Sequence, residues 1–404
     1  MASLQDSSAK AALTPTAPRV FRPERAAPSD VVRPTRAEIN LEALRHNLRI
    51  VQRQAGSARV FGVLKADGYG HGAKAVARTL ERAKIDGVCV ALLEEAIELR
   101  EAGIRTPIIV MGGYYGRAWA EISRYQLTPV IHDRDQIAEL AEEVRFGGAE
   151  SMDIHLKIDT GMARLGIRLP ELHSAVQTLA GCPEIRVTGL MTHFACADAG
   201  PREAILDQLA LFSEAEATLR QAGHTPSVRH AANSAALFRH PAAALDMVRP
   251  GIALFGVAPG LSVETTLRPA MRVRTEVVAL RQLRQGQTVG YGATWKAARS
   301  STIATVPLGY ADGLSRALSN QGHMLIRGRR APIVGVVSMD MTMLDVTDIE
   351  GVNMRDECVA LGAQKGPLGE ATITAEEVAE HMGSIPWEVL TNVSRRVPRF
   401  YREP

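Results

Sequence analysis

Cysteine is scarce in this chain of 404 residues, which contains only four. The four lie far apart and form no Cys-x-x-Cys pair: Cys89, Cys182, Cys196 and Cys358. Neither a disulfide framework nor a structural zinc site is indicated. The His-Glu-x-x-His pattern of metallohydrolases is also absent, so we expect no metal ion. Reduced thiols are typical of a cytoplasmic protein.

An excess of charge of one sign is also lacking, because 47 basic and 44 acidic residues leave a net charge of +3. This balance gives no reason to expect a nucleic acid as partner. No apolar run approaches the length that crosses a membrane, so we expect no membrane span. The hydrophobic content of 46% is enough for one large core or two ordinary ones.

The first 30 or so residues lack the apolar stretch of a secretory signal peptide and are rich in Ala, Pro, Ser and Arg. We expect a disordered tail over residues 1–35, whose role the sequence leaves open. A mitochondrial-type presequence is the alternative, although Asp6, Glu24, Asp30 and several prolines count against it.

Short β-branched runs alternate with amphipathic stretches from about residue 40 to 256. The strand-like runs are 59–65, 87–92, 107–111, 128–132, 152–158, 186–192, 227–231 and, as a possible eighth, 252–255. Strands that alternate with helices indicate a parallel sheet, and eight such units favour a (β/α)8 TIM-type barrel. We place the barrel at residues 36–268, with its first strand, about 36–42, able to pack with the C-terminal domain instead.

A second, mostly β domain is predicted over residues 269–404, where strand-like runs follow one another between turn residues. These runs are 271–283, 301–307, 323–327, 331–337, 342–346 and 358–361. Only residues 375–381 have a helical pattern. The fold class is therefore α/β, with a barrel followed by a β domain.

A lysine at the end of the first long apolar strand is the first candidate for chemistry. Residues 63–72 read VLKADGYGHG, so Lys65 ends a strand and precedes a glycine-rich loop. Active sites of such barrels lie at the carboxyl ends of the strands. Partial desolvation there favours the neutral lysine, which can form a Schiff base with an aldehyde cofactor. A lysine that merely ends a strand explains the pattern about as well.

Polar residues also stand at the ends of later predicted strands. They are Lys157, Arg164, His193, Asn233, Ser234 and Arg249. Each alone is explained better by an ordinary structural role, such as a helix cap or a hydrogen-bonded core histidine. Together they place polar groups at one rim of one barrel, which chance explains poorly.

At this point the sequence resembles the alanine racemases, pyridoxal 5'-phosphate (PLP) enzymes with a barrel and a β domain. The resemblance runs from about residue 36 to residue 401. It rests on the lysine segment and on five further motifs in the family's order: DTGMARLG at 159–166, VRPGI at 248–252, GYGAT at 290–294, GYADG at 309–313 and GVVSMD at 335–340.

The resemblance implies a role for each matching residue. Lys65 and Tyr291 would be the two catalytic bases, with Tyr291 supplied by the partner subunit of a homodimer. The cofactor-binding residues would be Lys65, Tyr69, His193, Asn233, Ser234, Arg249, Gly251 and Ile252. Arg164, Met339 and Tyr310 would bind substrate or narrow its entrance, and Lys157 matches a lysine that is carbamylated in some members.

Within this set, Arg249 would hydrogen-bond the pyridine nitrogen and His193 would link Tyr291 to Arg249. Asp340, beside Met339, would help to order the site. Two positions depart from the family's pattern. Arg395 stands where many members have a phosphate-contacting tyrosine, which puts that contact in doubt, and Ser338 replaces a cysteine found in some members.

The implied function is that of an isomerase interconverting L- and D-alanine, which supplies D-alanine as a peptidoglycan precursor. Serine and other small amino acids remain alternative substrates, and a non-catalytic PLP-binding barrel remains an alternative function. A decarboxylase would usually place a carboxylate at the cofactor nitrogen and carry a C-terminal cysteine motif, and neither is evident. A Schiff-base aldolase without PLP is disfavoured by the phosphate-type loops.

Overall fold

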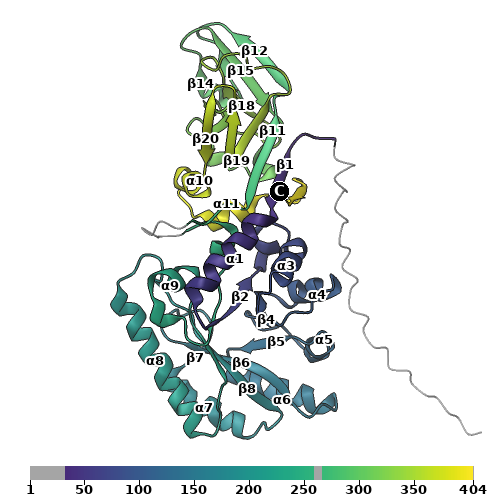
Figure 1. Cartoon of the computed structure of the whole chain (residues 1–404), viewed down its shortest axis with the longest axis vertical. Coiled ribbons are helices and arrows are strands. Elements are labelled where there is room, and N and C mark those ends of the chain that lie inside the picture. The colour runs from purple at the N-terminus through teal and green to yellow at the C-terminus, as the bar shows by residue number, and fades with distance from the viewer. Residues whose placement is uncertain (1–31, 259–265, 404) are drawn as a thin grey trace, which may run out of the picture.

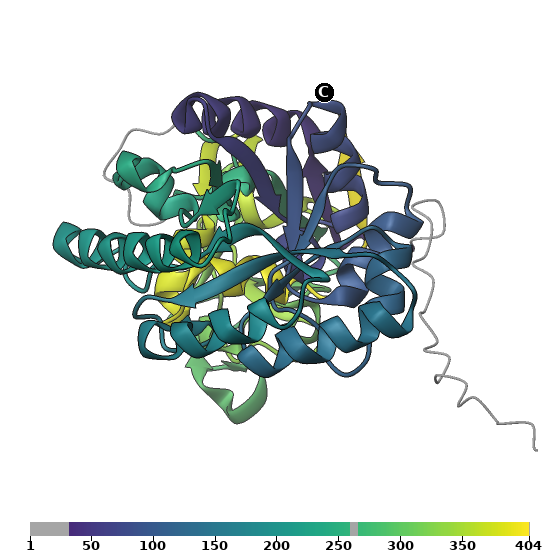
Figure 2. The same ribbon diagram turned by 90° about the horizontal axis from the view of Figure 1, so that it is seen from below.

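A computed structural model describes residues 32–258 and 266–403. The tail expected at 1–35 lies outside the described residues except for its last four positions. Figure 1 shows a barrel of strands and helices below a mostly β domain, and Figure 2 looks at the barrel from its far end. No helix in the described ranges is long and apolar enough to cross a membrane.

The barrel consists of eight parallel strands, as the alternating pattern predicts. In chain order these are β2 (Arg59–Val63), β3 (Gly87–Val90), β4 (Ile108–Val110), β5 (Thr128–Ile131), β6 (Met152–Asp159), β8 (Ile185–Met191), β9 (Val228–His230) and β10 (Met247–Val248). β5 pairs with β6 and β10 pairs with β2, so the sheet closes on itself. A short strand β7 (Ile167–Arg168) pairs in parallel with the end of β6.

Helices surround the barrel, and most of them connect one barrel strand to the next (Figure 2). They are α1 (Leu41–Ala55), α3 (Ala73–Arg82), α4 (Leu93–Glu101), α5 (Trp119–Arg124), α6 (Arg134–Phe146), α7 (Leu169–Ala180), α8 (Arg202–Gln221) and α9 (Ser234–Arg239). Their buried faces pack on the strands in one continuous apolar cluster.

The predicted eighth strand at 252–255 is wrong. These residues form the 3-10 helix η3 (Ile252–Phe255), and the eighth strand is β10, only two residues long. Pro250 explains the difference, because it has no N–H to donate and so ends the ladder. Its carbonyl still accepts from the N–H of Val63 at 2.8 Å, which keeps this segment beside β2.

The C-terminal domain contains a seven-stranded sheet. Its path is β17 (Arg329–Pro332), β16 (His323–Ile326), β19 (Glu357–Gly366), β11 (Met271–Glu276), β1 (Arg36–Asn40) and β21 (Arg399–Arg402), with β20 (Gly369–Ile373) paired to β19. A second sheet joins β12 (Ala279–Leu283), β15 (Ser301–Val306) and β18 (Thr342–Asp345), and β13 (Thr288–Val289) pairs with β14 (Trp295–Lys296). Strand β1 thus lies between β11 and β21, away from the barrel.

Three details of this domain differ from the expectation. The run at 271–283 is two strands, β11 and β12, which belong to different sheets. Of the run at 331–337, only the first two residues are strand, because β17 ends at Pro332. A second helix, α11 (Pro386–Asn392), follows α10 (Ala375–Met382). Pro386 stands in the first turn of α11, where its missing N–H costs nothing.

Candidate functional site

Lys65 lies directly after strand β2, at the start of a left-handed turn. Ala66, Asp67, Gly68 and Tyr69 all have φ between 51° and 61°. Such a conformation costs about 1–2 kcal/mol for each residue other than glycine, so the turn must be held by its surroundings. The Asp67 carboxylate accepts from the N–H of Ala73 at 2.9 Å, which ties the turn to the start of α3. The predicted glycine-rich loop is therefore a constrained turn.

Lys65 and four other predicted residues lie close enough together to interact electrostatically. The other four are Lys157, Arg164, His193 and Arg249. Burial, then Arg164, lowers the pKa of Lys65. Burial, then Arg164 and Arg249, lowers the pKa of Lys157 to about 8. This end of the barrel is thus strongly electropositive and suits an anionic ligand.

His193 lies two residues after the sixth barrel strand, β8, and beside Arg249. Burial, then Arg249, lowers the pKa of His193 to about 3, so its imidazole is neutral at physiological pH. Its Nδ1 lies 3.4 Å from Arg249 Nη2 and accepts from that guanidinium. The predicted contact between His193 and Arg249 is therefore present. The predicted contact between His193 and Tyr291 is not made within one chain, where Tyr291 is 73% exposed.

Arg249 is a buried cation surrounded by neutral acceptors. Its guanidinium donates to the carbonyls of Thr192 and Ala231 at 2.8 and 3.0 Å. It also donates to His230 Nδ1 at 2.7 Å. In the part of the chain that the structure describes, no carboxylate contacts it. Burial lowers the pKa of Arg249 to about 10, which leaves it charged at pH 7.

His230 and His155 are site residues that the sequence reasoning missed. His155 Nδ1 lies 2.8 Å from His230 Nε2, and both rings are buried. Since His230 Nδ1 accepts from Arg249, its Nε2 carries the proton and donates to His155. A signal was present, because alternation along β6 puts His155 and Lys157 on the same face of one strand.

Ser234 and Gly251 lie beside the lysine turn. The Ser234 hydroxyl accepts from the N–H of Gly251 at 2.9 Å and from that of Ala253 at 3.3 Å. Asn233 caps α9, accepting from the N–H of Ala236 at 2.9 Å. A Cβ on Gly251 would displace the Tyr69 hydroxyl. Of the predicted cofactor-binding residues, Tyr69, Ser234 and Gly251 are thus brought together here, and Ile252 follows at the first position of η3.

The remaining predicted residues belong to the C-terminal domain and are exposed. Tyr310 is 42% and Met339 50% exposed. The two are adjacent, since the N–H groups of Tyr310 and Ala311 donate to the carbonyls of Ser338 and Met339 at 3.0 Å each.

Asp340 and Arg395 are also exposed residues of the C-terminal domain. Asp340 forms an ion pair with Arg396 at 2.6 Å. Arg395 is exposed, and nothing in the described residues assigns it a role at a phosphate.

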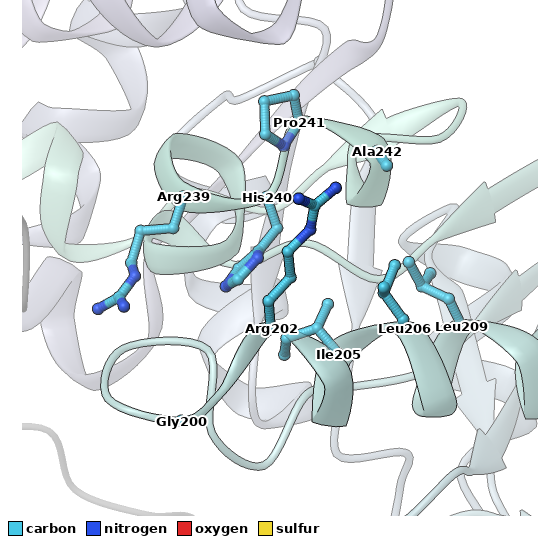
Figure 3. Close-up of a pocket in the computed structure, with 9 residues that line it drawn as sticks. All are labelled: Gly200, Arg202, Ile205, Leu206, Leu209, Arg239, His240, Pro241 and Ala242. Carbon is cyan, nitrogen blue, oxygen red and sulfur yellow. The ribbon is translucent and has the colours of Figure 1, made fainter.

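A cavity elsewhere on the barrel contains none of the predicted residues. It has a volume of about 340 Å³ and lies between the start of α8 and the end of α9 (Figure 3). Its polar side chains are Arg202, Arg239 and His240, above apolar residues of α8. This cavity is therefore separate from the candidate site, which lies at the rim around Lys65.

Comparison with protein families gives matches along most of the chain. Residues 39–259 match the alanine racemase N-terminal domain, and residues 270–401 match the alanine racemase C-terminal domain. An alanine racemase of Sorangium cellulosum is 58% identical over 379 residues, which cover 92% of this chain and all of that protein. One of Symbiobacterium thermophilum is 42% identical over 375 residues, covering 92% and 98%.

Solved structures agree with these matches. The alanine racemase of Streptomyces lavendulae, a producer of D-cycloserine, superposes with a TM-score of 0.86 at 32% identity, covering 93% of this chain and 98% of that one. The alanine racemase of Bacillus anthracis with bound L-Ala-P superposes with a TM-score of 0.85 at 32% identity, covering 92% and 96%.

Proposed function

We propose that this chain, which belongs to the alanine racemase family, is a PLP-dependent isomerase that interconverts L- and D-alanine. The observation that carries the proposal is the group of Lys65, Lys157, Arg164, His193 and Arg249 at one rim of the barrel. The group combines a lysine of lowered pKa with cations for a phosphate and a carboxylate, which are the charged groups of PLP and an amino acid.

The residues around Lys65 fit PLP. Neutral lysine is the form that attacks an aldehyde, and burial favours that form of Lys65. The Ser234 hydroxyl, which accepts from the N–H of Gly251, would donate its own proton to a phosphate, and Gly251 has no side chain to keep the phosphate from the backbone. Arg249, without a carboxylate partner, would face the pyridine nitrogen. PLP, when bound, delocalises the charge left at Cα after a proton departs.

Racemisation removes a proton from one face of Cα and returns one to the other, so it needs two bases on opposite faces. Lys65 supplies one base from the barrel. Tyr291 is exposed in the single chain, as are Tyr310, Met339 and Met341 on the same domain. Tyr310 and Met339 are adjacent, and adjacent exposed apolar side chains are typical of an interaction surface. We therefore assign Tyr291 to the site of a partner subunit in a homodimer.

Arg164 and the backbone of Met339 would bind the substrate carboxylate. The role proposed for the enzyme is the supply of D-alanine for peptidoglycan, in the cytoplasm. The four cysteines are free thiols, which agrees with that compartment.

Lys157 is expected to react with carbon dioxide. Its pKa of about 8 lies below the ordinary value for lysine because of burial and neighbouring cations. The neutral amine therefore predominates above pH 8, where it can form a carbamate, an anion that would orient Arg164. Removing bicarbonate at pH 8.5 should raise KM for alanine about tenfold, or ~1.4 kcal/mol.

The check on this carbamate is the same assay at lower pH and in a variant. The effect of bicarbonate should shrink as the pH falls through 8 and the amine becomes protonated. The variant Lys157→Ala should not respond to bicarbonate at any pH. An unchanged KM in wild-type protein without bicarbonate would contradict the assignment.

The experiment that tests the function is spectroscopy followed by turnover. Purified protein given PLP should develop the absorbance of a lysine-bound cofactor and convert L-alanine to D-alanine faster than serine. The band without alanine turnover would contradict the substrate and direct attention to serine or a carrier function. No band after addition of PLP would overturn the cofactor assignment.

A further inference from the structure

The carboxylate of Glu95 joins the loops that follow the first two barrel strands. Glu95 lies in the first turn of α4, after strand β3. Its Oε1 accepts from the N–H of Ala66 at 2.6 Å. Its Oε2 accepts from the N–H groups of Ala91 and Leu92 at 2.9 and 3.1 Å. One side chain thus satisfies three backbone donors from two loops.

The hydrogen bond from Ala66 to Glu95 uses the N–H of the peptide group between Lys65 and Ala66. That N–H lies at the point where the chain leaves strand β2 and enters the left-handed turn. The same turn is held at its far end, where Arg399 Nε donates to the carbonyl of Gly70 at 2.9 Å. A Cβ on Gly70 would also meet the carbonyl of Leu390. The turn is therefore fixed on both sides by groups outside it.

Glu95 also opposes the positive charge around the lysine. Arg164 lowers the pKa of Lys65 and Glu95 raises it, although burial has the larger effect. The carboxylate therefore bears on Lys65 both through the backbone and through its charge.

We propose that Glu95 is a positioning residue for Lys65, holding the Lys65–Ala66 peptide so that the left-handed turn presents the amine to the cofactor. The inference rests on the proposed function of Lys65. The simpler explanation is that Glu95 only caps α4, since its bond to Leu92 is an ordinary capping box. A cap alone would not account for the bond to Ala66, which belongs to another loop.

Helix α7 offers a matched control. Glu171 occupies the same position in a capping box, accepting from the N–H of Arg168 at 3.4 Å. It is exposed, and its partner is Arg168 of its own helix start. Glu171→Ala therefore reports the cost of losing a helix cap on a barrel helix, together with an exposed ion pair to Arg168 that contributes little. Glu95→Ala reports the cost of a cap plus any effect on Lys65.

The test has one measurement without cofactor and two with it. In the apoprotein, Glu95→Ala should speed hydrogen exchange of the amides at 64–72, and Glu171→Ala should not. With PLP, Glu95→Ala should slow the appearance of the lysine-bound absorbance and lower kcat about 10- to 100-fold, with KM changed less. Glu95→Gln keeps the side-chain length, loses the charge and one acceptor, and should give intermediate values.

The outcomes separate this proposal from the proposed function. If wild-type protein binds no PLP, the function fails, and exchange at 64–72 still decides whether Glu95 holds the turn. If wild-type protein racemises alanine but both variants match the Glu171→Ala control in exchange and kcat, the positioning role is overturned. Should Glu95→Ala fail to fold, the same comparison is made with Glu95→Gln.

Discussion

Replacement of Lys65 by alanine is expected to lower kcat/KM for racemisation by at least about 10⁴-fold in both directions, because it removes the covalent attachment of the cofactor and one base together. Lys65 stands at the end of β2 with a lowered pKa, and Lys157, the other lysine of the cluster, comes from β6. The measurement is conversion of L- to D-alanine and of D- to L-alanine, each with PLP in excess.

Lys74 provides the matched control for that variant. It lies nine positions further along, on α3, and forms an exposed ion pair with Glu98 at 3.1 Å. Surface pairs of this kind contribute little to stability, so Lys74→Ala should keep nearly full activity. A Lys65→Ala protein that folds, binds PLP and retains more than about a tenth of the activity would contradict the assigned base.

Replacement of Tyr291 by phenylalanine is expected to lower kcat about 10²- to 10⁴-fold in both directions, because one of the two faces of Cα loses its base. Lys65 would remain, so one enantiomer should still exchange its α-proton with solvent. Nuclear magnetic resonance of each alanine enantiomer in heavy water measures this exchange separately. Tyr115→Phe is the control, since that tyrosine is 83% exposed and belongs to no predicted site.

Equal loss of exchange for both enantiomers would contradict a base that serves one face.

The variants Lys65→Ala and Tyr291→Phe together also test whether Tyr291 reaches the site of a partner subunit. If it does, mixing inactive Lys65→Ala and Tyr291→Phe subunits should restore about a quarter of the sites, because half of the dimers are mixed and each holds one intact site. If Tyr291 acts within its own chain, mixing restores nothing.

The barrel was predictable because short apolar runs alternate along the chain with helices that are long enough to show a period. Strand β10 was not, because its two residues are too few for any pattern and the run at 252–255 is longer and equally apolar. Helix α11 was missed for a similar reason, since it spans only seven residues. Short elements are determined by their neighbours, which the sequence does not display.

The candidate site was predictable where it depends on strand ends. Lys65, His193 and Arg249 follow barrel strands, and such ends meet at one rim. The left-handed turn after Lys65 was not predictable, because two of its residues, Ala66 and Tyr69, ordinarily avoid positive φ. Glu95 and His230 were missed because their partners, Ala66 and Arg249, are distant in sequence and come close only when the barrel closes.

Strand β1 has a consequence for the order in which the protein is completed. Its first neighbour, β11, begins at Met271, and its second, β21, pairs Ala37 with Arg399. The ribosome therefore finishes the whole barrel while β1 still lacks both partners. Until β11 and β21 have been synthesised, β1 presents unpaired backbone groups, which can pair wrongly with other chains. Closure of the sheet must wait until Arg399–Arg402 have been synthesised, and such distant pairing is slow.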